Sequence, residues 1–209
     1  MMPAITDPKI NDYLMKLSLE DDPLVLEMER LARKNNFPIV DRLVGRLIYL
    51  LTKLKDPRLV VELGSGYGYS AYWFAKALGR GKVILTDNEE DNIAYAKEIF
   101  GKAGLSGKAS FHAGDAVSIA SAYRDINILF IDIDKHEYPR AIKRLLPNLA
   151  KNALVIADNT LWYGKVTGKN RDRDTLGIKK FNEFMFGNAD FFSTLLPLRD
   201  GVLIAYKVR

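Results

Sequence analysis

The stretch that decides the fold is Val60-Val61-Glu62-Leu63-Gly64-Ser65-Gly66-Tyr67-Gly68-Tyr69-Ser70. An apolar run ends near an acidic residue, and three glycines at alternate positions then lead into a helical pattern. Glycine suits a backbone that turns sharply and lies against a ligand, and the helix N-terminus beyond it leaves N–H groups unpaired. The stretch therefore predicts a strand-turn-helix unit that binds a nucleotide, with a turn that binds no ligand as the alternative.

The glycine spacing separates two classes of nucleotide site. A dinucleotide fingerprint of the form G-x-G-x-x-G would place glycine at position 69, where this chain has Tyr69. The observed form is E-x-G-x-G-x-G, which resembles the first motif of class I S-adenosylmethionine (SAM)-dependent methyltransferases. A nicotinamide-dependent oxidoreductase is disfavoured by this spacing, but it stays as an alternative from another functional class.

Composition limits the architecture and the location. A chain of 209 residues suits one domain over 1–209, whose residues 1–55 form a helical lead-in. No apolar run approaches the roughly 18 residues of a membrane span, so no membrane association is expected. The first residues lack the pattern of a secretory signal, and the chain has no cysteine, which excludes disulfides and thiolate metal sites. We expect a cytoplasmic protein.

The formal net charge of +5 has two interpretations. A polyanionic acceptor, such as RNA or a coenzyme A thioester, would be attracted to basic patches. The 31 basic residues are, however, interspersed with 26 acidic ones, which favours an ordinary mixed surface.

Strand and helix patterns alternate after the lead-in, whose helical pattern from Pro8 to Lys55 is broken at Pro38. Strands separated by helices indicate parallel pairing, whereas the last two apolar runs, joined by five residues, must pair antiparallel. The fold class is therefore α/β, a doubly wound and mostly parallel sheet with a C-terminal antiparallel hairpin, as in the class I SAM-methyltransferase (Rossmann-like) fold. The expected strands are 59–63, 82–86, 109–112, 126–131, 153–157, 191–196 and 202–208, and helices are expected at 69–78 and 90–103.

Two acidic positions near the glycine turn are candidates for nucleoside binding. Asp87 ends the second strand, where a carboxylate can accept hydrogen bonds from both ribose hydroxyls, and its alternative role is to cap the next helix. Gly114-Asp115-Ala116 follows the third strand and would lie beside the adenine, although Gly-Asp is also common in turns.

Oxygen-bearing side chains follow the fourth and fifth strands. Asp132 lies in the segment Phe130-Ile131-Asp132-Ile133-Asp134-Lys135 at the end of the fourth strand, and Asp158 and Asn159 follow the next strand. Because carboxyl ends of parallel strands share one edge of a sheet, these three oxygen ligands would suit Mg²⁺. Strand ends capped by backbone N–H groups are the alternative.

Lys135 lies three residues after Asp132 and is the candidate general base. A lysine beside a divalent cation, partly desolvated, would have a lowered pKa and could take a proton from a hydroxyl. An exposed lysine paired with Asp134 or Glu137 is the alternative. His112 and His136 are expected to be structural.

Three motifs in order, at 62–70, 130–135 and 157–162, resemble the cation-dependent O-methyltransferase family that includes catechol and caffeoyl-CoA O-methyltransferases. The resemblance covers nearly the whole chain, and the small bacterial and archaeal members fit best. It implies a SAM cofactor, Mg²⁺ or another divalent cation held by Asp132, Asp158 and Asn159, and Lys135 as the general base. The residues that would contact or support the methyl donor are Glu62, Gly64, Ser65, Gly66, Ser70, Asp87, Gly114, Asp115, Ala116 and Asp132.

The family resemblance also bears on the acceptor. Trp162 resembles the aromatic residue that lines the acceptor site in the caffeoyl-CoA branch, with ordinary packing as the alternative. The basic segment Tyr163–Asp174 suggests a mobile lid or a solvated loop, and it lacks the proline-rich loop of the plant enzymes, which argues against a caffeoyl-CoA acceptor. We expect a small hydroxylated aromatic acceptor such as a catechol. The alternatives are a 5-hydroxyuridine in tRNA and a non-enzymatic module that binds the donor but no metal. The family resemblance also predicts a homodimer.

Overall fold

The computed structural model describes residues 5–209. The chain forms two compact units. The glycine-loop unit is Asp12–Ala116, and the C-terminal unit combines residues 5–11 with Val117–Arg209. The single domain expected over 1–209 stays a prediction.

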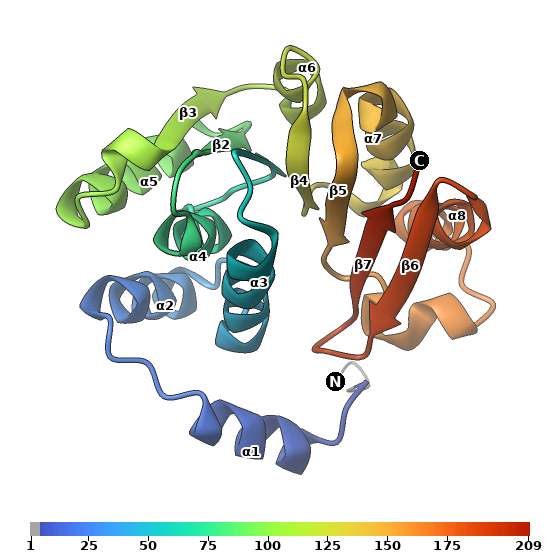
Figure 1. The fold of residues 1–209 in the computed structure, drawn as a ribbon. Coiled ribbons are helices and arrows are strands. Elements are labelled where there is room, and N and C mark those ends of the chain that lie inside the picture. Colours follow the sequence, from blue (N-terminus) through green and yellow to red (C-terminus); the bar gives the residue numbers. More distant parts are fainter. Residues whose placement is uncertain (1–4) are drawn as a thin grey trace. The chain divides into compact units, whose positions relative to one another are not determined.

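The glycine-loop unit contains a parallel three-stranded arrangement, β3-β2-β1, of which Figure 1 labels β2 and β3. Helices α3 and α4 contact each other, and α5 lies against β2 and β3. The strands have the apolar character of buried parallel strands, and Val60, Val61 and Leu63 are fully buried. The elements are α2 (Pro23–Asn35), α3 (Arg42–Lys55), β1 (Leu59–Leu63), α4 (Tyr69–Ala77), β2 (Lys82–Asp87), α5 (Glu90–Lys102), the 3₁₀ turn η1 (Ser106–Lys108) and β3 (Ala109–Ala113).

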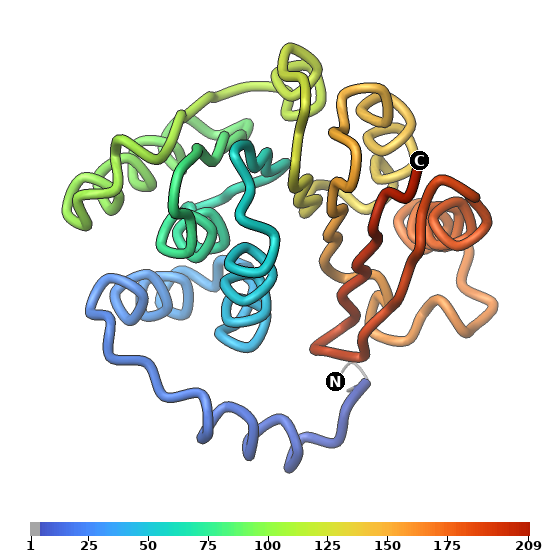
Figure 2. Tube along the Cα trace, in the orientation of Figure 1, coloured from blue at the N-terminus to red at the C-terminus, as the bar shows by residue number. Residues whose placement is uncertain are grey.

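The C-terminal unit contains the strand order β4-β5-β7-β6, in which β4 and β5 are parallel while β7 pairs antiparallel with both β5 and β6. The predicted terminal hairpin is thereby confirmed, and Figure 2 follows the chain through its short turn into β7 beside β5. Helix α8 contacts both α7 and β6. The elements are α6 (Ala116–Ala120), β4 (Ile126–Ile131), η2 (Lys135–Glu137), α7 (Tyr138–Leu145), η3 (Leu146–Asn148), β5 (Leu149–Ala157), η4 (Trp162–Thr167), α8 (Arg173–Gly187), β6 (Phe191–Leu196) and β7 (Val202–Lys207).

The helical lead-in has one more break than the sequence pattern predicted. Helix α1 spans Pro8–Leu17, and α2 begins at Pro23 after a non-helical segment. The side chain of Asp22 accepts a hydrogen bond from the Leu24 N–H at 2.9 Å and caps α2, while Pro23 occupies its first turn. Asp22-Pro23 therefore starts a new helix, which the periodic apolar pattern alone did not indicate.

Strand β5 begins earlier than the predicted 153–157. It spans Leu149–Ala157, and its pairing with β4 shifts register between Ile126 and Ile128. The added residues include Lys151 and Asn152, both exposed and polar, which is why this part of the strand resembles a loop in the sequence.

None of the described helices has both the length and the apolar composition that a membrane crossing requires.

Candidate functional site

Backbone hydrogen bonds hold the glycine loop after β1 against the end of β2. The N–H groups of Gly64 and Ser65 both donate to the Thr86 carbonyl, at 3.1 and 2.9 Å, and the Ser65 hydroxyl accepts from the Thr86 N–H at 3.1 Å. Gly66 has a φ of 48°, a conformation that favours glycine, and a Cβ there would lie 2.9 Å from the Phe37 ring. The loop therefore has a fixed shape, with no room for a side chain at its centre.

Asp87 fastens this loop rather than capping α5 directly. Its Oδ2 accepts from the Gly66 N–H at 2.8 Å, while Oδ1 accepts from the Glu89 N–H at 3.0 Å and from Asn92 at 2.9 Å. The N-cap of α5 is Glu89. Each carboxylate oxygen has two lone pairs, so these three hydrogen bonds leave one acceptor site of Asp87, on Oδ2, for a ribose hydroxyl.

The other predicted donor-binding residues of this unit lie around the same strand ends. Glu62 is fully buried at the end of β1, and its carbonyl accepts from the Thr86 hydroxyl at 2.7 Å. Ser70 is buried in the first turn of α4. Gly114 follows β3 and donates its N–H to the Asp87 carbonyl at 2.8 Å, and Asp115 and Ala116 come directly after it.

An aromatic stack on the glycine loop was not predicted as part of the site. The Phe37 and Tyr67 rings stack with centroids 3.9 Å apart, and Tyr95 lies tilted at 5.3 Å from Tyr67. Asn35 also donates to the Tyr67 hydroxyl at 3.1 Å. Phe37 is 29 positions before Gly66, so no local pattern in the sequence joins the two residues.

In the C-terminal unit, the predicted metal ligands lie together at the ends of β4 and β5. These strands are parallel neighbours, and the Asp158 N–H donates to the Ile131 carbonyl at 3.2 Å. Asp158 is 1% exposed and Asn159 is 9% exposed, whereas the Asp132 side chain is more open at 23%. The register thus brings Asp132, Asp158 and Asn159 to one edge, as the sequence predicted.

The carboxylate of Asp158 has the features of a cation ligand. Among the described residues its Oδ1 has no hydrogen-bond partner, and its Oδ2 lies 3.6 Å from the Arg199 guanidinium. Burial and the charge of Asp132 raise the pKa of Asp158 to about 7, although Arg199 opposes the shift. A buried carboxylate oxygen without a partner costs free energy, and a divalent cation would remove that cost. The two carboxylates and one amide therefore fit a hard cation.

The amide of Asn159 is oriented by a second carboxylate. Its Nδ2 donates to both Oδ1 and Oδ2 of Asp200, each at 2.9 Å, which leaves its carbonyl oxygen available as a ligand. The described residues contain no group of three or more His, Cys, Asp or Glu side chains suited to a metal. The proposed set differs from such a group because its third member is an asparagine.

Lys135 lies in this acidic cluster and is not an exposed lysine. Its Nζ donates to Asp132 Oδ1 at 2.7 Å and to the Ile133 carbonyl at 3.0 Å, and it lies 5.4 Å from the Tyr138 ring centroid. Burial by itself would lower the pKa of Lys135, but the Tyr138 oxygen and the Asp132 carboxylate raise it well above its usual range. The lowering of the Lys135 pKa expected beside a divalent cation stays a prediction, because the raised pKa reflects the side chains of the cluster alone.

Trp162 adjoins the base and the metal ligands. It has a left-handed φ of 46°, and its N–H donates to the Asn159 and Asp200 carbonyls, both at 3.0 Å. The Nζ atoms of Lys135 and Lys165 lie 5.9 and 5.4 Å from its ring. The ring is therefore held beside the cluster by backbone contacts, in a position consistent with the predicted acceptor-lining role.

Sequence reasoning missed three further residues of this cluster. Tyr138 is fully buried, and its hydroxyl lies 3.1 Å from both the Ile131 and the Asp158 carbonyls, so it joins the ends of β4 and β5. Arg199 and Asp200 come from the turn between β6 and β7. Their contacts are with residues about 40 positions earlier, so they leave no local pattern in the sequence.

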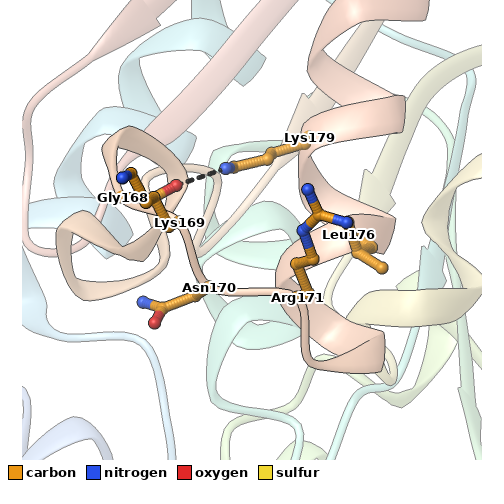
Figure 3. A pocket seen from close by; sticks show the side chains of 6 residues that line it. All are labelled: Gly168, Lys169, Asn170, Arg171, Leu176 and Lys179. Carbon is orange, nitrogen blue, oxygen red and sulfur yellow. Dashed lines mark hydrogen bonds between the residues drawn. The ribbon is translucent and has the colours of Figure 1, made fainter.

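A basic pocket of about 590 Å³ lies between the segment after η4 and helix α8 (Figure 3). Three of its six lining residues are cationic, namely Lys169, Arg171 and Lys179. Lys179 reaches from α8 and donates to the Gly168 carbonyl at 2.8 Å. The remaining lining residues are Gly168, Asn170 and Leu176, so the pocket contains no acidic side chain.

His136 has structural contacts. Its Nδ1 lies 3.1 Å from Asp174 Oδ1, and its backbone N–H donates to the same oxygen at 3.2 Å. A Cβ at Gly177 would meet the His136 backbone, so η2 and α8 are in close contact. These contacts are consistent with the expected structural role.

Comparison with known proteins identifies the class. A family model described as O-methyltransferase matches residues 15–208, so the chain belongs to the O-methyltransferase family. The chain is 28% identical over 190 residues to a catechol O-methyltransferase of Niastella koreensis, covering 87% of this chain and 86% of that protein. The predicted family and the enzyme class, a SAM-dependent O-methyltransferase, are confirmed, which argues against the oxidoreductase and the non-enzymatic module.

Solved structures confirm the predicted fold class. A methyltransferase from Geobacter sulfurreducens is 39% identical, with a TM-score of 0.87 and coverage of 99% of this chain and 100% of that one. An O-methyltransferase from Bacillus cereus, solved in complex with SAH, has a TM-score of 0.86 over 95% of this chain and 97% of its own. At 23% identity the second likeness concerns the fold alone.

Proposed function

We propose that this protein transfers the methyl group of SAM to a hydroxyl of a catechol-like acceptor, with a divalent cation such as Mg²⁺. The observation that carries the proposal is the cluster of Asp132, Asp158 and Asn159 with Lys135 at the ends of β4 and β5. The relatedness to a catechol O-methyltransferase supports the acceptor class.

The glycine-loop unit would bind the methyl donor. The fixed loop at Gly64, Ser65 and Gly66 gives close backbone approach, and Asp87 would accept a hydrogen bond from the ribose while it holds Gly66. Glu62, Ser70 and the segment 114–116 lie around the same strand ends and would support the donor. Asp132, which is also expected to contact the donor, belongs to the C-terminal unit.

Asp132, Asp158 and Asn159 would hold the cation through two carboxylates and one amide oxygen. When bound, the cation would neutralise the carboxylates around Lys135 and acidify an acceptor hydroxyl. Arg199 lies 3.6 Å from Asp158 and provides part of the charge compensation within the protein itself. Such a site acts by positioning and charge stabilisation.

Lys135 Nζ would receive the proton of the acceptor hydroxyl. The short contact with Asp132 fixes the amine at the cluster, and the nearby Trp162 ring gives an aromatic acceptor an apolar surface. The acceptor site would thus have the Lys135 amine as its base and the Trp162 ring as its apolar wall.

The basic pocket favours a second candidate, in which the acceptor is a 5-hydroxyuridine of tRNA. Lys169, Arg171 and Lys179 lie in one pocket without an acidic lining residue, an arrangement that attracts phosphates (Figure 3). Binding of tRNA that falls steeply with salt, together with methylation of undermodified tRNA, would favour this candidate over a catechol.

We also infer a homodimer and a cytoplasmic location. Helix α1 has no buried residue, and Ile10, Tyr13 and Leu17 are each more than half exposed, which supports burial against a second copy. The absence of cysteine supports the location.

The experiment is a methyl-transfer assay with SAM over catechols, hydroxycinnamoyl thioesters and undermodified tRNA, with and without EDTA. We expect turnover of a catechol that EDTA abolishes and Mg²⁺ restores. If EDTA changes the turnover of no acceptor, the proposed metal dependence is wrong. If only tRNA is methylated, the second candidate replaces the catechol-like acceptor.

A further inference from the structure

We propose that Asp200, in the turn between β6 and β7, is a positioning residue that orients the Asn159 amide for cation binding. The inference rests on the proposed function. It concerns how the C-terminal hairpin positions residues 158–162, the ligand loop, which follows β5 and carries two of the proposed cation ligands. Asp200 lies outside the predicted ligand set.

The contact between the two side chains is specific. Asn159 Nδ2 lies 2.9 Å from each oxygen of the Asp200 carboxylate, and Asp200 is only 3% exposed. A carboxylate accepts hydrogen bonds and cannot donate them, so the amide must turn its NH₂ group toward Asp200. The side-chain oxygen of Asn159, Oδ1, then lies on the opposite side of the amide group. Of the two polar side-chain atoms, only Oδ1 can bind a cation.

Backbone hydrogen bonds fix the hairpin turn to the same loop. The Asp200 carbonyl accepts from the N–H groups of Leu161 and Trp162, at 2.7 and 3.0 Å, and the Thr160 N–H donates to the Gly201 carbonyl at 2.9 Å. Gly201 has a φ of 100°, and a Cβ there would collide with the Leu161 backbone. The turn and the ligand loop are therefore held as one piece.

The neighbouring turn residue acts on the other ligand. Arg199 lies 3.6 Å from Asp158 Oδ2, while Asp200 contacts Asn159, so consecutive residues of the turn contact consecutive residues of the ligand pair. Without Asp200, the Asn159 amide could rotate and present NH₂ to the cation, which would repel it. Loss of a residue that orients a metal ligand typically weakens metal binding about 10- to 100-fold.

The test measures Mn²⁺ affinity by isothermal titration calorimetry on the full-length wild-type protein and on the variants Asp200→Ala and Asp200→Asn. We expect D200A to lose about 10- to 100-fold in Mn²⁺ affinity. D200N should lie closer to wild type, because its side-chain carbonyl can still accept from Asn159. SAM affinity should be unchanged in both, since the glycine loop belongs to the other unit.

Glu183→Ala is the matched control, because Glu183 is an exposed acidic residue of α8 in the same unit. It should leave Mn²⁺ affinity unchanged, which separates orientation from general loss of negative charge. In ¹⁵N spectra, the Asn159 side-chain NH₂ signals, assigned by comparison with Asn159→Asp, should be protected from exchange in wild type and D200N but not in D200A.

Three results would overturn the inference. Wild-type Mn²⁺ affinity in D200A, or an equal loss in D200A and D200N with SAM binding intact, would overturn the role of Asp200 and leave the proposed function standing. A wild-type protein that binds no Mn²⁺ would overturn both. Should D200A fail to bind SAM through misfolding, D200N decides, because wild-type Mn²⁺ affinity together with unprotected Asn159 NH₂ signals in D200N would overturn the role of Asp200.

Discussion

Lys135 lies beside the acidic side chains of the cluster. Its ammonium group lies 2.7 Å from Asp132, and the Tyr138 oxygen and the Asp132 carboxylate raise its pKa well above the usual range, although burial opposes the shift. Under the proposed function, a cation that neutralises the carboxylates would let this ammonium lose its proton and act as a base. The same side chain would thus have two roles, depending on what the cluster binds.

Replacement of Lys135 by alanine should lower turnover by at least about 100-fold, the range expected for loss of a general base. Mn²⁺ affinity should be unchanged or higher, because a positive charge beside Asp132 is removed. Steady-state methyl transfer and calorimetry give the two values. Lys151→Ala, at an exposed position of β5, is the control for loss of a lysine, and a K135A rate equal to the wild-type rate would exclude the base role.

Single residues also connect elements in the glycine-loop unit. Asp22 caps α2 through Leu24 and, through Oδ2, accepts from the Tyr72 hydroxyl at 3.0 Å and from Lys76 at 2.8 Å, both on α4. Burial by itself would raise the pKa of Asp22, but the hydrogen bonds from Lys76 and Leu24 lower it below 3.8. The start of one helix is therefore fastened to another helix by one carboxylate.

At the element scale, this predicts a specific acid sensitivity. Because the folded-state pKa of Asp22 is depressed, its stabilisation is present above the unfolded value of 3.8 and is lost as pH falls through the folded value. Asp22→Asn should cost about 1 kcal/mol near neutral pH. The difference from wild type should shrink below pH 3.8.

Urea unfolding at several pH values measures that difference. Asp21→Asn is the control, because Asp21 is an exposed neighbour that does not cap the helix. A stability difference between wild type and D22N that stays constant down to pH 3 would contradict the assignment of Asp22.

The elements were largely predictable, and their cross-contacts were not. Buried parallel strands such as 59–63 and 126–131 are apolar except for Glu62 and Asn127, so their bounds follow from local sequence and agree with the structure. The Asp200–Asn159 contact and the Phe37 ring beside Gly66 join residues far apart in the chain. No periodic pattern in the local sequence predicts such a pair. The raised pKa of Lys135 likewise depends in part on a residue distant in the chain, Asp158.

At the scale of the whole molecule, the two proposed binding functions belong to different units. The glycine loop and Asp87 lie within Asp12–Ala116, whereas the acidic cluster lies within Val117–Arg209. The donor-binding residues of the glycine-loop unit make their described contacts within that unit, as Asp87 does with Gly66 and Asn92. Loss of the cation should therefore leave the donor loop intact.

Removal of divalent cations should consequently separate binding from turnover. EDTA should abolish methyl transfer, while SAM affinity measured by calorimetry should change by less than about threefold, a difference of roughly 0.6 kcal/mol. Asp158→Ala should reproduce this pattern without a chelator, and added Mg²⁺ should restore turnover in the wild type but not in the variant. A parallel loss of SAM binding and turnover in D158A would instead show that the acidic cluster is needed for the donor site itself, and the proposed division between the units would be wrong.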